Sequence, residues 1–396
     1  MLKKILRSIV PAVLITLPIG SVYAFSLFAP LMAEHLGASI RSVQFAFSLS
    51  IFFLGMGAAF FGPIVEKNIK VAGMLAAFLF GIGCITTALA MQFKSIWLLY
   101  IGYGLFCGLG QGTGYIVPVK TLLLWFPKHK GLAAAVSIIS FGLGSSFCSW
   151  LFKLIYPTTG IVSIYAVLAI VYFWMMLFGS LLIKKPENEN SHDSASISKM
   201  HLKQILCDRF FLQSWLFMFL NISAGLALIG VTASMFKEVG ISSNAVIMLM
   251  VVCGVMNGAG RLVFAAVADM LKTRLDIWLA LLGISIVLAA SSSCIYVPIA
   301  VAAMVLGVNA CYGAGFSTIP GILSDHYGNN QLSTIHGLTL SAWGFAGLVG
   351  NQLSILVHNL TGSFYGVAIL TLAMYAVNFI NVFGLRARYG KEDTIH

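Results

Sequence analysis

The feature of this sequence that most limits its possible folds is a series of twelve apolar runs, each about as long as a membrane-spanning helix. A helix needs about 20 apolar residues to cross the hydrocarbon core of a bilayer. Short polar segments separate the runs, and only 9% of the 396 residues are charged, whereas a soluble domain carries roughly 25%. A soluble core could not bury this much apolar surface, so we predict an all-α membrane protein.

The twelve predicted spans form two groups of six, separated by a polar stretch. In chain order they are 9–32, 43–64, 71–91, 97–125, 132–155 and 161–183, then 211–235, 245–267, 277–293, 297–319, 335–356 and 364–385. The stretch between the groups is too polar to fold by burying apolar surface. We therefore predict two six-helix bundles, 1–183 and 210–396, joined by a linker, 184–209.

The formal net charge is +11, and its distribution predicts the orientation in the membrane. Loops on the cytoplasmic side of membrane proteins are enriched in Lys and Arg. If the N-terminus lies inside the cell, seventeen Lys and Arg residues fall on the cytoplasmic side and four on the other. We expect a multi-pass inner-membrane protein with both termini in the cytoplasm and the lipid bilayer as its main partner. The charge serves orientation and does not indicate nucleic-acid binding.

The two halves repeat one another weakly but in register. Glu66 follows the second span and Asp269 follows the eighth, 203 residues later, and basic residues follow each acid. In the fourth and tenth spans, two glycine-rich segments end at Pro118 and Pro320, which are 202 residues apart. Two matches at nearly the same offset indicate a duplicated six-helix unit.

The acidic and basic turns that follow the second and eighth spans resemble the signature loop of the major facilitator superfamily. The resemblance covers the whole chain, with Glu66 in place of the usual aspartate and Ala265 in place of the usual glycine in the second copy. It implies two bundles that alternate access to a central site. It also implies that these loops gate the cytoplasmic face, through Glu66, Lys67, Asp269, Lys272 and Arg274.

A more specific resemblance is to the oxalate/formate antiporter and monocarboxylate transporter branch of that superfamily. It depends on the segments 110–118 and 125–133, on Asn257–Arg261 in the eighth span, and on 20–23 in the first. In that branch the arginine of the eighth helix binds the substrate carboxylate, and Arg261 occupies its place. Animal monocarboxylate carriers have an aspartate that takes part in proton coupling where this chain has Asn257.

Arg261 is also a candidate binding residue on physical grounds, because a charge at membrane depth is costly and usually marks a substrate or ion pathway. It precedes Asp269 by eight residues, which places it roughly 12 Å inside the end of the span. All twelve acidic residues fall in loops or at helix ends in this topology. An arginine offers a planar, bidentate fork for a carboxylate. A structural arginine that bonds backbone carbonyls or reaches the cytoplasm is the alternative.

Several other polar or aromatic residues in the predicted spans could orient a small carboxylate. Asn257 shares a helical face with Arg261, four residues away. The remaining candidates are Tyr23, Tyr115, Tyr312 and Gln111, each of which could equally serve interhelical packing. We expect Lys120 to extend toward the cytoplasm. His336 could carry a proton or be a hydrogen-bonded packing residue.

Trp343 bears on the charge of the substrate. The oxalate carrier of the resembling branch uses two cations, and an ungapped alignment of 337–343 places Trp343 where its eleventh helix has a lysine. A second carboxylate would then enter the protein without a cation, which costs several kcal/mol. The sequence therefore favours a monoanion, and packing between helices is the alternative role of Trp343.

We predict a secondary active transporter of a small organic anion, most simply a monocarboxylate, that works as a monomer by alternating access. The seven scattered cysteines show no metal or redox spacing, and we find no phosphate-binding loop, so we predict no metal, no cofactor and no enzymatic activity. Coupling to protons and exchange against another anion both stay open. The alternatives are a carrier of a neutral or zwitterionic nutrient or drug, and a membrane sensor that does not transport.

Overall fold

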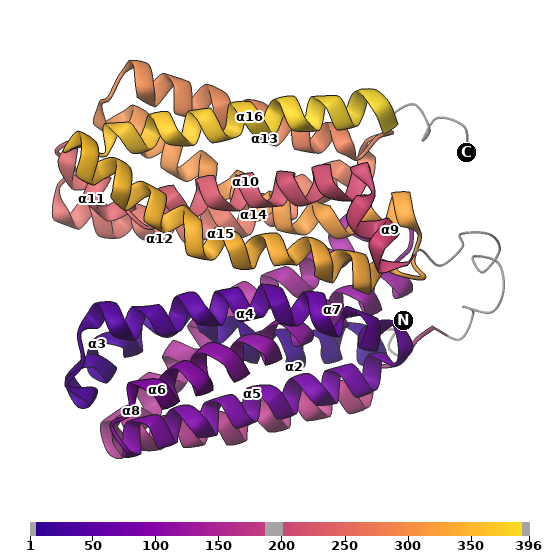
Figure 1. Cartoon of the computed structure of the whole chain (residues 1–396), viewed down its shortest axis with the longest axis vertical. Helices are drawn as coiled ribbons and strands as arrows, with labels where there is room; N and C mark the ends of the chain where they lie inside the picture. The colour runs from indigo at the N-terminus through magenta and orange to yellow at the C-terminus, as the bar shows by residue number, and fades with distance from the viewer. Residues whose placement is uncertain (1–4, 187–200, 390–396) are drawn as a thin grey trace. The chain divides into compact units, whose positions relative to one another are not determined.

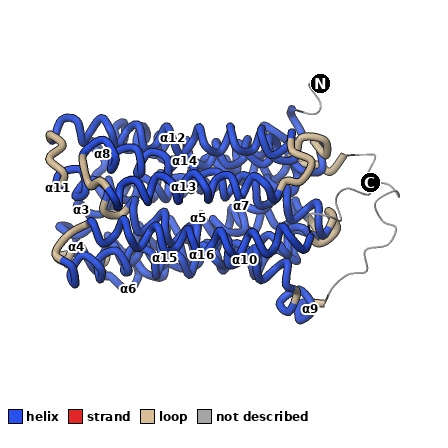
Figure 2. The backbone as a smooth tube through the Cα atoms, turned by 90° about the horizontal axis from the view of Figure 1, so that it is seen from above, coloured by secondary structure: helices blue, strands red, loops and turns tan. Residues whose placement is uncertain are grey.

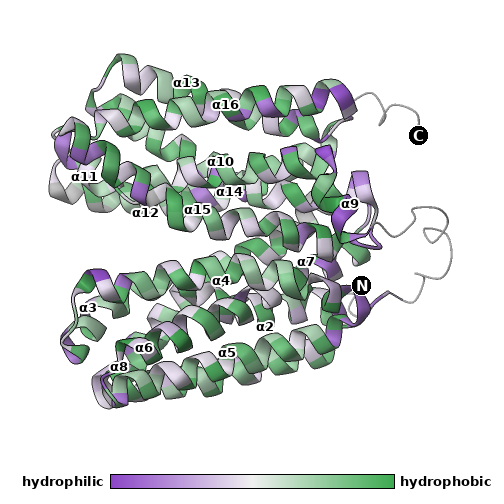
Figure 3. Ribbon diagram, viewed as in Figure 1, coloured by the Kyte–Doolittle hydropathy of each residue, from purple (hydrophilic) through white to green (hydrophobic). Residues whose placement is uncertain are grey.

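The computed structural model describes residues 5–186 and 201–389, and these residues form helices joined by short loops, without a strand (Figure 2). The predicted all-α class is confirmed. Lipid offers no hydrogen bonds to the backbone, so a spanning segment must satisfy its N–H and C=O groups internally, as a helix does. Figure 3 shows hydrophobic residues along most of each long helix and hydrophilic residues gathered near helix ends.

Ten helices in the described part of the chain are long and apolar enough to span a membrane. One of them, α8 (Lys130–Leu182), contains a break at Gly160, whose φ of 71° is unfavourable for residues with a side chain. It therefore supplies both the fifth and the sixth predicted spans. The fourth span consists of α6 (Ile96–Leu99), η3 (Tyr100–Cys107) and α7 (Gly108–Trp125). The twelve predicted spans thus all correspond to helices.

The contacts divide the chain into two units, Met1–Lys199 with Leu323–Gly344, and Met200–Ile322 with Phe345–His396. The first unit contains, besides α6, η3, α7 and α8, the helices η1 (Ile5–Ile9), α2 (Val10–Ile19), η2 (Gly20–Ala24), α3 (Phe25–Leu36), α4 (Ile40–Lys67) and α5 (Ile69–Gln92) (Figure 1). Its most extensive helix contacts join α5 to α8, α2 to α8 and α4 to α7. A Cβ atom on Gly112 of α7 would lie 2.0 Å from the Leu54 carbonyl oxygen of α4, so only glycine allows these two backbones to approach so closely.

The second unit is built from the remaining helices. They are α9 (Leu202–Cys207), α10 (Arg209–Ile229), α11 (Thr232–Glu238), α12 (Ser243–Met270), α13 (Leu275–Cys294), α14 (Pro298–Tyr327), α15 (Leu332–Thr361) and α16 (Tyr365–Tyr389). The end of α14 and the beginning of α15 belong to the first unit, because Leu323–Gly344 is grouped with it. This segment brings His336 and Trp343 into the first unit.

The structure refines two predicted boundaries. α14 continues to Tyr327, eight residues beyond the predicted end, with Pro320 inside the helix; buried helices tolerate proline because their neighbours satisfy the freed backbone groups. Part of the predicted linker forms the short helix α9, whereas its residues 187–200 lie outside the described residues. The Asp208 carboxylate accepts a hydrogen bond from the backbone N–H of Phe211 at 3.3 Å and so caps the N-terminus of α10.

Glu238, the last residue of α11, joins three segments of the second unit. Its carboxylate accepts hydrogen bonds from the backbone N–H of Phe364 at 3.0 Å, from the hydroxyl of Tyr296 at 3.3 Å and from the hydroxyl of Ser363. Partial burial raises the pKa of Tyr296, and the negative charge of Glu238 raises it further. These bonds hold the α13–α14 and α15–α16 loops against α11.

Candidate functional site

In the second unit, Arg261 lies on α12 with only 6% of its surface exposed. Its Nε–H donates a hydrogen bond to Oδ1 of Asn257, one helical turn earlier, at 3.0 Å. The predicted common face of these two residues is therefore observed. The guanidinium carbon also lies 5.8 Å from the ring centre of Phe316 on α14, within the range of a cation–π interaction. A side-chain oxygen and an aromatic ring thus fix the orientation of the guanidinium plane.

Two glycines bring α12 and α14 close enough for these contacts. A Cβ on Gly313 of α14 would lie 2.3 Å from the Asn257 carbonyl oxygen and 3.0 Å from Cγ of Arg261. A Cβ on Gly260 of α12 would lie 2.1 Å from the carbonyl oxygen of Ala310. Any larger residue would push the helices apart. The glycine-rich segment of the tenth span therefore packs directly on the candidate anion anchor.

Tyr312 on α14 belongs to the same cluster. Its ring meets the ring of Phe316 edge to face, with 5.3 Å between centroids. It is 4% exposed and packs over Gly225 of α10, whose Cβ would lie 2.3 Å from the tyrosine ring. We call Asn257, Arg261, Tyr312 and Phe316 the arginine cluster. It contains three of the residues predicted to bind substrate, together with Phe316, which the sequence did not single out.

In the first unit, three further candidates gather around Phe141 of α8. The ring centroid of Phe141 lies 5.4 Å from Tyr23 of η2, 5.7 Å from Tyr115 of α7 and 6.1 Å from Trp343 of α15. Tyr115 and Trp343 also contact one another at 5.9 Å. Tyr115 and Trp343 are almost fully buried, whereas Tyr23 is 36% exposed. We call these four residues the aromatic cluster.

Gln111 takes a different position from the other candidates. It precedes Tyr115 by one turn on α7 and is 1% exposed. Its Oε1 accepts a hydrogen bond from the hydroxyl of Ser50 on α4 at 3.3 Å. Within the first unit, Gln111 therefore contributes to the contact between α7 and α4.

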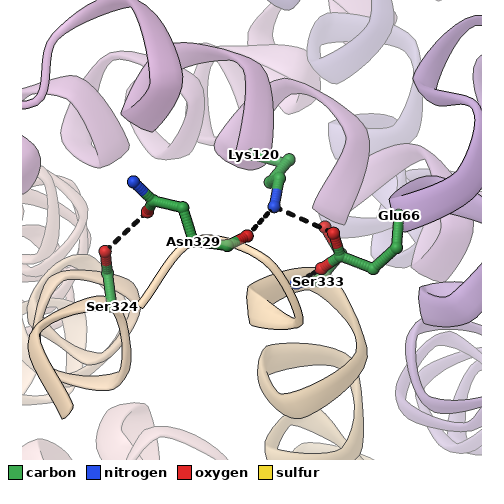
Figure 4. A network of polar contacts seen from close by, with 5 residues as sticks. All are labelled: Glu66, Lys120, Ser324, Asn329 and Ser333. Atoms are coloured by element: carbon green, nitrogen blue, oxygen red, sulfur yellow. Dashed lines mark hydrogen bonds and ion pairs between the residues drawn. The ribbon is translucent and has the colours of Figure 1, made fainter. Parts of the chain in front are cut away.

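The acidic residue of the first signature loop lies in a network of polar contacts, shown in Figure 4. The Lys120 ammonium on α7 bonds Oε2 of Glu66, at the end of α4, at 2.9 Å. It also donates to the backbone carbonyl of Asn329, in the turn between α14 and α15. The other carboxylate oxygen of Glu66 accepts the backbone N–H of Ser333 in the first turn of α15. Asn329 is held in turn by the hydroxyl of Ser324 at 2.8 Å.

Lys120 does not reach solvent in the structure. Its side chain is only 5% exposed, and its ammonium points to the Glu66 carboxylate and the Asn329 carbonyl. The sequence separates Lys120 from Glu66 by 54 residues. Nothing in the local pattern around either residue signals that they pair, because the pairing depends on how α7 and α4 pack.

The second signature loop is organised locally. Arg274 Nη2 donates to Oδ1 of Asp269, five residues earlier, at 3.0 Å. Lys67 at the end of α4 and Lys272 in the α12–α13 loop are both exposed. Among the described residues, no group of three or more His, Cys, Asp and Glu side chains is arranged to hold a metal ion.

Two residues that the sequence did not single out as binding candidates, Phe141 and His336, also contact Tyr115. Phe141 connects the aromatic cluster, yet an aromatic residue in an apolar span gives no signal of such a role. His336 lies on α15 beside Tyr115, with 6.2 Å between ring centroids. The sequence left its role open between a proton carrier and a hydrogen-bonded packing residue.

Long apolar helices, a buried arginine and an ion pair at helix ends are features of a polytopic membrane transport protein. The chain belongs to the Major Facilitator Superfamily, whose family model matches residues 12–351. This confirms the family and the fold that the signature loops indicated, and makes the chain a multi-pass secondary transporter.

Two curated relatives and one solved structure illustrate the similarity. YhjX of Escherichia coli (strain K12), an uncharacterized MFS-type transporter, is 25% identical over 343 residues, which cover 83% of this chain and 82% of YhjX. The oxalate:formate antiporter of Oxalobacter formigenes is 23% identical over 361 residues, which cover 88% and 84% of the two chains. The crystal structure of the transporter FucP in the outward conformation superimposes with a TM-score of 0.71 at 14% identity, covering 94% of this chain and 97% of FucP. At that identity the likeness to FucP shows the fold alone.

Proposed function

We propose that this transporter carries a small organic anion, most simply a monocarboxylate, and that Arg261 binds its carboxylate. The observation that carries the proposal is the buried guanidinium of Arg261, which Asn257 and Phe316 hold in a fixed orientation. An arginine in the interior of a membrane protein is costly and usually functional. A carboxylate matches the planar donor fork of a guanidinium better than a neutral or cationic solute does.

The similarity to an oxalate:formate antiporter supports an anionic substrate, although that relative is only 23% identical. The words oxalate and formate describe the substrates of that relative. In this chain the anion anchor is proposed from the arginine cluster, and Tyr23, Tyr115, Trp343 and Gln111 are proposed as further substrate-binding residues. Transport by alternating access and a monomeric state also belong to the proposal.

A balance of buried charges favours a monoanion over a dianion. Among the described residues, the Lys and Arg side chains that are buried are Arg261 and Lys120. The positive charge of Lys120 is compensated by Glu66 at 2.9 Å. The proposal assigns the Arg261 guanidinium to the first carboxylate of the substrate. A second carboxylate would then meet no further buried Lys or Arg among the described residues, which costs several kcal/mol. We expect formate-, lactate- or pyruvate-like anions to bind at least a hundredfold more tightly than oxalate or malonate.

The polar network at Glu66 is proposed to act as a gate. Glu66 is bonded both to Lys120 on α7 and to the backbone of Ser333 in the first turn of α15. A movement of α15 relative to α4 must break the bond to Ser333. We propose gating roles for Lys67, Asp269, Lys272 and Arg274 as well, from their places in the two signature loops. The charge distribution along the sequence favours the cytoplasmic face for these loops and for both termini, and an inner-membrane location.

The test is uptake of radiolabelled anions into proteoliposomes by the wild-type protein and by Arg261→Gln. Losing a charge-assisted contact to a buried partner costs about 2–5 kcal/mol, so Arg261→Gln should lower apparent affinity at least thirtyfold. Arg261→Lys keeps the charge but loses the bidentate fork, and should recover only part of the loss. Arg388→Gln is a matched control, because Arg388 is exposed at the end of α16.

The same assay distinguishes the rival functions. Uptake of a sugar or a zwitterionic amino acid that is unaffected by Arg261→Gln would replace the anion proposal with a neutral-solute carrier. Ligand binding without flux would favour a sensor. Wild-type affinity for anions in Arg261→Gln, with normal insertion into the membrane, would make Arg261 a structural residue.

A further inference from the structure

His336 is a buried titratable residue whose chemistry is not accounted for by packing. It is 1% exposed, in the first turns of α15. Its Nε2 has no hydrogen-bond partner among the described residues. A buried polar atom without a partner destabilises the folded protein, whereas an apolar side chain of similar shape would fill the same space without that cost. The expectation of a hydrogen-bonded packing residue therefore does not describe Nε2.

The backbone around His336 holds the imidazole firmly in place. A Cβ on the next residue, Gly337, would lie 2.0 Å from the Ala58 carbonyl oxygen, so α15 and α4 are in direct backbone contact there. On the α7 side, the Tyr115 ring lies 6.2 Å away at an interplanar angle of 52°. His336 thus adjoins the aromatic cluster within the first unit.

Charged groups lie on the helices that pack near this part of α15. The titratable groups are Arg41, Glu66 and Lys67 on α4 and Tyr115 and Lys120 on α7; Asp325 and His326 lie near the end of α14. Glu66 and Lys120 bond one another, so together they add no net charge. A proton on His336 would therefore introduce a positive charge that neither member of this pair offsets.

We propose that His336 is the proton-binding residue of this carrier, which accepts a proton at Nε2 together with the transported anion. The proposal rests on the anion-carrier function proposed above and decides between its two modes of coupling, in favour of proton symport. Tyr115, one of the proposed substrate-binding residues, lies beside the imidazole. An anion bound there offsets the charge of the imidazolium, so anion and proton each promote binding of the other. This linkage is reciprocal by thermodynamic necessity.

The experiment separates proton-driven accumulation from anion exchange in the same proteoliposomes. A pH-sensitive dye inside reports proton entry, and a radiolabelled monocarboxylate reports both uptake driven by an acidic exterior and counterflow against unlabelled anion. In the wild-type protein, protons should enter with the anion. His336→Gln keeps a polar side chain that does not titrate, and should lower proton-driven accumulation at least tenfold while counterflow continues.

Two comparisons make the result specific. His358→Gln alters a histidine near the other end of α15, stacked on Phe364, and should leave proton-driven uptake unchanged. Arg261→Gln should weaken counterflow and proton-driven uptake together, because it removes the proposed anion anchor. A loss of both activities in His336→Gln, in protein that still elutes as a single folded species, would contradict a role restricted to the proton.

Failure of the proton-site proposal and failure of the anion-carrier proposal give different results in this experiment. Anion transport by the wild-type protein without proton entry would overturn the proton site and leave the anion carrier intact. If the wild-type protein carries no anion, the anion-carrier proposal fails, and the proton site that rests on it fails with it.

Discussion

The two signature loops of this transporter begin with the same kind of residue but use it differently. Glu66 in the first loop bonds Lys120, 54 residues away, and the backbone of Ser333, 267 residues away. Asp269 in the second loop bonds Arg274, only five residues away. The first acid joins three helices, whereas the second closes its own turn.

A repeated motif can thus keep its position in the fold while its contacts diverge. The partners also differ in their access to water. The Lys120 side chain is 5% exposed, whereas Arg274 is 17% exposed. Removal of the acid should therefore be more costly in the first loop, where the remaining cation cannot reach water.

The largest loss of stability is expected for Glu66→Gln. The substitution keeps the shape and the acceptor for the Ser333 N–H, but it removes the charge that compensates Lys120. Breaking a buried pair by removing one partner destabilises a protein by about 3–5 kcal/mol. Among Glu66→Gln, Asp269→Asn and Asp276→Asn, the first should cause the largest fall in apparent melting temperature, measured on purified protein in detergent.

A double-mutant cycle shows whether the pair itself causes this loss. Lys120→Met combined with Glu66→Gln leaves no buried charge, so the double variant should be more stable than the sum of the two single losses predicts. Strict additivity would mean that the two side chains act independently, and the contrast between the loops would lose its physical basis.

Asp269→Asn should destabilise the protein less than Glu66→Gln does. It removes the charge-assisted bond to Arg274, but a partly exposed guanidinium in a turn can rotate toward water. We expect a loss of about 1–2 kcal/mol, detected by the same melting measurement. A loss as large as that of Glu66→Gln would show that the second acid is as important as the first.

The sequence predicted the helices well and their mutual contacts poorly, for a physical reason. Hydropathy and length identify a span because lipid imposes both, and all twelve predicted spans correspond to helices. The end of α14 was missed because the predicted span stopped at 319, whereas the helix continues through Pro320 to Tyr327.

Contacts were predictable only where one helix supplies both partners. The spacing of four residues between Asn257 and Arg261 predicted their shared face, and the structure shows the hydrogen bond. The contact of Arg261 with Phe316 and the pairing of Glu66 with Lys120 depend on how each helix is rotated about its axis. Apolar spans that are hydrophobic on all sides carry no periodic signal of that rotation.

The smallest loss of stability is expected for Asp276→Asn. This substitution tests whether burial or sequence distance causes the difference between the two loops. Asp276 in the first turn of α13 pairs with Arg386 near the end of α16, 110 residues away. Like the Glu66 pair, this pair joins distant helices, but Arg386 and Asp276 are 31% and 41% exposed. Exposed ion pairs contribute about 0–1 kcal/mol because water and salt screen them, so Asp276→Asn should barely change the melting temperature, and the change should shrink further in high salt. If it instead destabilised the protein as much as Glu66→Gln, the linking of distant helices rather than the burial of Lys120 would explain why the first loop depends on its acid.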